Sequence, residues 1–171
     1  MLVAFWMVQR LTREIHNLEK EAMDKHTELA HYQKYAGVLG GSSIMNVTNL
    51  AGLSQEILPR ASVFAQYSDQ ASSMSAMQNL QMMKMMGRVP MTGNPMMQMQ
   101  IELSAYNQFK AEALKALKQQ EINVMNEKEK EIELEMNAIE QRLKMKRAQL
   151  ESYKNLASKQ AEEMAPKFGL G

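Results

Sequence analysis

Residues 122–157 decide the fold, and they read INVMNEKEKEIELEMNAIEQRLKMKRAQLESYKNLA. Apolar side chains recur here at intervals of three and four residues, with charged residues between them. This spacing predicts an amphipathic helix with one apolar stripe. There is no glycine or proline between Pro95 and Pro166, so the predicted helix covers residues 95–165 and leaves a tail at 166–171. Asn94 is the expected N-cap, and Pro95 takes the first helical position, where its missing N–H costs nothing.

Residues 1–36 carry a matching repeat and predict a second long helix. Their apolar positions follow a 4-3 spacing that only Lys25 interrupts, which is typical of a coiled coil. The predicted contact stripe of the two terminal helices comprises Val8, Leu11, Ile15, Leu18, Leu29, Tyr32, Ile122, Met125, Ile132, Met136, Ile139, Leu143, Leu150 and Tyr153.

Residues 37–94 differ from both ends, because they are poor in charge and rich in Gly, Ser and Met. The glycines from Gly37 onward are expected to end the first helix. The spacing of Leu50, Leu53 and Ile57 indicates a short helix stopped by Pro59. A second helix is predicted at about residues 61–86, followed by a turn-rich break.

These elements predict an all-α fold: an elongated helical hairpin with coiled-coil N- and C-terminal helices and a Met-rich, low-charge middle. The first helix is expected to pack on the C-terminal half of the long helix, and the middle helix on its first half. A pair of packed helices leaves one face open, so we expect further copies or other partners to cover it.

Composition excludes several classes of function. The chain has 20 basic and 19 acidic residues, whereas a nucleic-acid binder normally carries a basic excess, so no specific nucleic acid is expected. Cysteine is absent, which removes thiolate chemistry and disulfides. No catalytic motif is present, so we do not expect an enzyme. The apolar start is too short to span a membrane and has the wrong charge order for a cleavable signal peptide.

Methionine is the most unusual component, with 18 residues, ten of them between Met74 and Met99. Thioethers bind copper(I), but no His or Cys lies in this segment, whereas methionine is a common flexible apolar filler. We therefore expect no cofactor and no metal, and interpret the segment as a contact surface for another copy or for a client protein. Its residues are Met74, Met77, Met82, Met83, Met85, Met86, Met96, Met97 and Met99.

The stretch from Gln81 to Gly87, QMMKMMG, resembles the Met-rich finger loop of the signal-sequence-binding domain of the signal recognition particle. The resemblance is confined to this low-complexity stretch, and we interpret it as shared composition. It implies an adaptable apolar surface.

Two further patterns involve charge. A basic block, Arg142, Lys144, Lys146 and Arg147, follows an acidic block; we expect it to pair with acidic flanks of a neighbouring helix and to set the stagger between subunits. Glu28-Leu29-Ala30-His31 matches the Glu-x-x-His motif of di-iron helical bundles. That site needs a second motif and two more glutamates, which the sequence lacks, so these residues are expected on a solvated flank.

The sequence thus favours a structural subunit of a homo-oligomeric filament, tube or ring. The layout is similar to the axial subunits of flagellar and type III secretion filaments, and a phage or virus tube or pilot component fits as well. The alternative is a helical chaperone or holdase whose Met-rich surface binds hydrophobic client segments. The expected partner is the chain itself, with other assembly or export proteins as further partners. The sequence does not fix the location; we favour an extracellular or virion assembly over the cytoplasm.

Overall fold

A computed structural model describes residues 2–41 and 52–164 of the chain. Three helices cover most of this part: α1 (Leu2–Gly40), α3 (Leu58–Met85) and α4 (Pro95–Met164). The described ranges contain no strand. The predicted all-α class is therefore confirmed.

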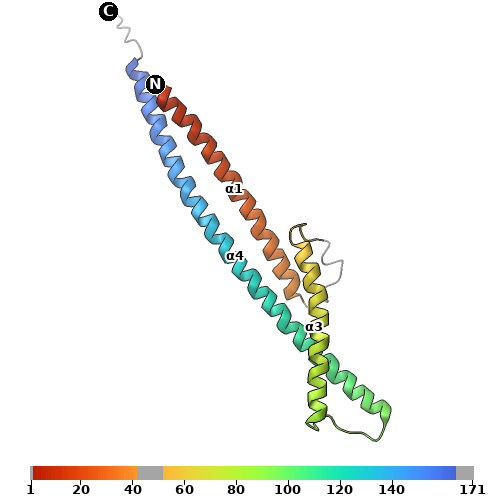
Figure 1. The fold of residues 1–171 in the computed structure, drawn as a ribbon. Helices are drawn as coiled ribbons and strands as arrows, with labels where there is room; N and C mark the ends of the chain where they lie inside the picture. The colour runs from red at the N-terminus through yellow and green to blue at the C-terminus, as the bar shows by residue number, and fades with distance from the viewer. Residues whose placement is uncertain (1, 42–51, 165–171) are drawn as a thin grey trace, which may run out of the picture. The chain divides into compact units, whose positions relative to one another are not determined.

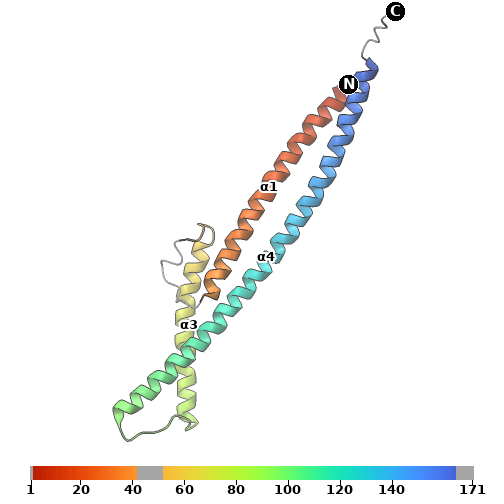
Figure 2. The ribbon, with the colours of Figure 1, turned by 180° about the vertical axis from the view of Figure 1, so that it is seen from behind.

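The chain divides into two compact units, and α1 and α4 each contribute to both. Unit 1 combines residues 1–29 with residues 130–171, and unit 2 comprises residues 30–129. In unit 1, α1 lies along the C-terminal part of α4, as both views show (Figures 1 and 2). Ile15 of α1 packs there against Ile139 and Leu143 of α4, all three buried. These branched side chains are spaced to form one apolar contact between two helices.

Unit 2 has its own core, in which residues from α1, α3 and α4 meet. Its buried members are Tyr35, Leu39, Ile57, Ala61, Phe64 and Met125. Tyr35, Ala61 and Met125 have no exposed surface at all. A core supplied by separate segments fixes where α3 lies within this unit, and α3 carries most of the groove described below.

Small side chains form the buried face of α3. Besides Phe64, its buried residues are Ala61, Ser68, Ser72 and Ala76, which recur about every four residues and so share one face. Each serine hydroxyl donates a hydrogen bond to a carbonyl of its own helix, Ser68 to Ala65 and Ser72 to Asp69, both at 3.1 Å. The hydroxyls are thereby satisfied and can be buried without an unpaired polar group.

Helix caps are present where α3 ends and where α4 begins. Gly87 has φ 66°, and its N–H donates to Lys84, while that of Arg88 donates to Met83, both at 3.0 Å. This pair of bonds is a Schellman motif, which needs the left-handed conformation that glycine adopts without strain. At the start of α4, the Asn94 side chain accepts a hydrogen bond from the Met96 N–H at 3.0 Å. The predicted N-cap is confirmed.

Two predicted boundaries are wrong. The first helix does not end before Gly37 but continues to Gly40. Glycine inside a helix costs about 1 kcal/mol relative to alanine, and burial of Leu39 in the unit 2 core offsets that cost.

The second error concerns the short helix at Leu50, Leu53 and Ile57. Leu50 lies outside the described residues. Leu53 lies in a bend and Ile57 in a turn, and Pro59 is an early residue of α3 rather than a helix stop. Proline is well tolerated in the first turn of a helix, where its N–H is not needed.

Candidate functional site

The positions of the predicted contact stripe are buried or half-buried throughout. They belong to both units: Tyr32, Ile122 and Met125 pack into the unit 2 core. Ile15, Leu18, Ile139, Leu143 and Leu150 pack together in unit 1. The repeat at each end of the chain therefore contributes to two separate cores.

Most of the methionines predicted as a contact surface are exposed to solvent. Met83 alone of that set is half-buried, and the exposed ones are Met74, Met77, Met82, Met85, Met86, Met96, Met97 and Met99. Met91, which was not in the predicted set, is 97% exposed. The structure thus leaves this apolar surface uncovered in the single chain.

On α3 these methionines belong to a larger apolar outer face. We use this name for Val63, Tyr67, Met74, Met77 and Met85, which are all more than half exposed and share one side of the helix by their spacing. The opposite side carries the small buried residues. Apart from the buried Phe64, these larger apolar side chains of α3 are exposed while small ones are buried, contrary to the usual pattern of an amphipathic surface helix. The sequence alone predicts the methionines as contact residues but not Val63 and Tyr67, although their spacing from Met74 places them on the same side of the helix.

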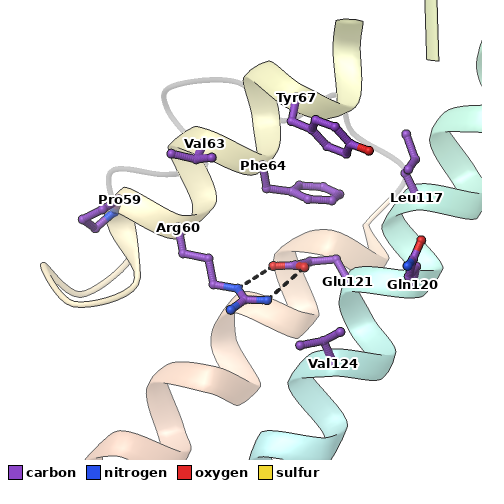
Figure 3. Close-up of a pocket in the computed structure, with 9 residues that line it drawn as sticks. All are labelled: Pro59, Arg60, Val63, Phe64, Tyr67, Leu117, Gln120, Glu121 and Val124. Carbon is purple, nitrogen blue, oxygen red and sulfur yellow. Dashed lines mark hydrogen bonds and ion pairs between the residues drawn. The ribbon is translucent and has the colours of Figure 1, made fainter. Parts of the chain in front are cut away.

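An open apolar groove of about 520 Å³ lies between α3 and α4 in unit 2 (Figure 3). It is lined by Pro59, Arg60, Val63, Phe64, Tyr67, Leu117, Gln120, Glu121 and Val124. Phe64 and Tyr67 project from α3 toward α4 in this view. The groove cannot be predicted from local sequence patterns, because residues about sixty positions apart form its two walls.

One carboxylate organises the polar edge of the groove. Glu121 accepts two hydrogen bonds from the Arg60 guanidinium, at 2.7 and 3.1 Å, and one from the Tyr35 hydroxyl at 3.3 Å. Burial raises the pKa of Tyr35 well above its usual range, and the nearby Glu121 carboxylate raises it further. Glu121 in turn raises the pKa of Arg60. The carboxylate is therefore occupied by its own chain, and the free walls of the groove are apolar.

The charged residues of α3 are all paired within unit 2. Arg60 pairs with Glu121, Asp69 with Lys110 at 2.9 Å, and Lys84 with Glu102 at 2.6 Å. Lys110 has a raised pKa because of Asp69, and Glu102 a lowered one, first because of Lys84. The apolar outer face of α3 therefore has no unpaired charge beside it from its own helix.

The predicted basic block divides into two pairs of residues. Lys146 binds Glu14 and Arg147 binds Glu19, both at 2.7 Å across unit 1. Arg142 and Lys144 are exposed, and in the described residues they have no ion pair. Half of the block thus joins the two helices of unit 1, and the other half faces solvent.

The Glu-x-x-His motif has no metal-site geometry around it. Glu28 binds Lys25 at 2.9 Å, and His31 is half-buried on the same helix. Within residues 2–41 and 52–164, no three His, Asp or Glu side chains lie close enough together to hold a metal ion. In the same ranges, no helix is long and apolar enough to cross a membrane.

The chain matches no model of a known protein family, and it has no significant similarity to the curated proteins or the solved structures with which it was compared.

Proposed function

We propose that the protein is a structural subunit of a homo-oligomeric filament, tube or ring. In this proposal α1 and the C-terminal part of α4 pair as an antiparallel coiled coil that stiffens the subunit, and α3 supplies a contact between subunits. The single observation that carries the proposal is the inverted arrangement of α3, with small residues inside and large apolar residues outside. Large exposed apolar side chains that share one side of a helix favour an interaction site there, although the exposed Gln70 and Gln81 lie among them.

The charges favour a second copy of the chain as the partner. Every charged side chain of α3 is already paired within unit 2, so a partner with its own unpaired charges would have to desolvate them without compensation. The apolar outer face of another copy carries none. Two copies can therefore pack α3 against α3 through the same surface, as in a twofold symmetric contact.

The groove of Figure 3 favours a second candidate function, a helical chaperone or holdase. Its apolar walls are formed by Val63, Phe64, Tyr67, Leu117 and Val124, of which Val63 and Tyr67 are more than half exposed. A bulky side chain of an unfolded client fits such a site, and flexible methionines beside it suit varied sequences.

Electron microscopy and analytical ultracentrifugation distinguish the two functions. The wild-type chain is expected to form extended or closed assemblies of many copies. The variant Met74→Gln/Met77→Gln should keep its helical circular dichroism and stop at small species, because it makes the contact face polar. The matched control is Met23→Gln, which changes a side chain that is 68% exposed in unit 1. A wild-type chain that stays small and suppresses aggregation of an unfolded client would support the chaperone instead.

A further inference from the structure

The face of α4 that points away from α1 in unit 1 carries its own row of exposed side chains, three of them apolar. Leu134, Ala138, Gln141 and Met145 follow a 4-3-4 spacing and so share one side of the helix; we call these residues the outer stripe. All four are exposed, Leu134 by 70% and Met145 by 61%. The residues that contact α1, such as Ile139 and Leu143, lie on the opposite side and are buried.

Charges flank the outer stripe on both sides; Lys130 and Glu140 lie on the same flank as Glu133 and Lys144, and Glu131 lies on the other. Glu133 precedes Lys144 on one flank, and Glu135 precedes Arg142 on the other. At 3.6 residues per turn, each of these last four positions lies close to a right angle from the stripe. Such positions correspond to the e and g sites that set pairing and orientation in coiled coils.

We propose that α4 of a second copy packs antiparallel on the outer stripe, about a twofold axis level with Ile139. This proposal rests on the proposed assembly function and adds a second contact to it. About that axis, Glu133 of one copy faces Lys144 of the other, because the two lie at nearly the same distance from the axis, about 8 Å along the helix. Glu135 faces Arg142 in the same way, and Leu134 meets Met145 in the centre.

The charge pattern disfavours the parallel alternative. Two parallel copies in register would place the acidic half beside the acidic half and Arg142 near Lys144 of the partner. Like charges at such positions are destabilising. The antiparallel arrangement instead brings Glu133 next to Lys144 and Glu135 next to Arg142.

A second contact is also what a growing assembly requires. A twofold contact through α3 buries the α3 surface of both copies, so this contact alone forms a dimer and no larger assembly. A separate twofold contact through α4 lets each copy bind two neighbours, so that the assembly can extend. The two contacts involve different units of the chain.

Glu133 and Lys144 are the best residues for a test, because neither has an ion pair within the described residues. Glu135 already binds Lys25 at 2.7 Å, so its replacement would also disturb α1. The background for the test is Met74→Gln/Met77→Gln, in which the α3 contact is weakened. This variant is expected to remain a dimer through α4.

In that background, Lys144→Glu makes the four paired positions at Glu133 and Lys144 of the two copies acidic, and Glu133→Lys makes them basic. Each is expected to weaken the dimer roughly tenfold at low salt, because two attractions become two repulsions. A 1:1 mixture of the two variants restores opposite charges at both pairs and should restore the dimer. Lys20→Glu and Glu21→Lys, exposed changes on α1, serve as charge-matched controls and should leave it unchanged.

Cysteine cross-linking tests the position of the axis, since the chain has no cysteine of its own. Ala138→Cys lies close to the axis and should cross-link to the same residue of the second copy. Leu156→Cys lies about 25 Å from the axis along the helix and should not. Cross-linking of Leu156→Cys but not of Ala138→Cys would overturn the proposed alignment.

Other outcomes separate this proposal from the proposed function. If wild type assembles but the Met74→Gln/Met77→Gln variant is a monomer, the α4 contact is wrong and the assembly function stands. The α4 contact is also wrong if a dimer forms and neither charge reversal weakens it. If the wild-type chain is itself a monomer at all concentrations, both proposals fail.

Discussion

The two units of the chain pack their helices together with different kinds of side chain. In unit 1, branched apolar residues such as Ile15 and Leu143 lie inside, and ion pairs such as Glu19–Arg147 bridge the helices outside. In unit 2, α3 turns Ser72 and Ala76 inward and larger apolar residues outward. Unit 1 therefore buries its large apolar side chains between two helices, whereas α3 of unit 2 leaves Val63, Tyr67 and several methionines exposed to solvent.

Leu143→Asp should have the largest effect on stability. It places a charge in the buried contact of unit 1 with no partner, which costs several kcal/mol, on the order of the stability of a small domain. We expect loss of cooperative thermal unfolding by circular dichroism at 222 nm. The control Leu156→Asp changes a half-exposed residue of the same helix and should melt nearly as wild type does. Equal melting of both variants would show that Leu143 is not in a tight core.

Ser72→Leu tests the packing of unit 2. The residue has no exposed surface, so the added atoms must push α3 away, at a cost of about 1–3 kcal/mol. Gln78→Leu, on an exposed position of α3, is the control and should change stability little. Chemical denaturation followed by circular dichroism measures both. If Ser72→Leu is as stable as Gln78→Leu, small residues are not required on this face.

The contrast between the units also explains which features of the fold could be predicted from the sequence. The 4-3 repeat through Ile15 and Leu143 and the Asn94-Pro95 start signal predicted the terminal helices, because large apolar residues and caps act locally. The buried face of α3 was not predicted, because Ser and Ala are also common on exposed helix surfaces and only the tertiary contact distinguishes the two. Similarly, nothing local links Arg60 to Glu121, so the groove followed only from the structure.

Tyr35 is expected to have a smaller effect on stability, which appears at high pH. Its pKa is raised above the ordinary value of 10.0 in the folded chain, so above about pH 10 the unfolded chain loses this proton while the folded chain keeps it. Stability should therefore fall as the pH rises past 10. Tyr35→Phe removes this contribution, so its melting temperature should fall less between pH 9 and pH 11 than that of wild type. Tyr67→Phe, an exposed tyrosine, should behave as wild type. An unchanged pH dependence in Tyr35→Phe would contradict the buried hydroxyl.

The smallest effect concerns the ion pairs of unit 1, which lie at the surface. The pKa of Glu14 is lowered from its ordinary value of 4.5, first by Lys146 and then by Arg10. Because the folded pKa is depressed, the stabilisation is present above pH 4.5 and is lost as the pH falls through the lower folded value. Glu14→Gln should therefore lower the melting temperature slightly at pH 7 in low salt and not at all near pH 2, where wild type has also lost the charge. Added salt should reduce the difference at pH 7, since exposed pairs are screened. If the difference in melting temperature persists in high salt and at low pH, Glu14 supports unit 1 by packing rather than by charge. The division between an apolar interior and a charged exterior would then not hold for this residue.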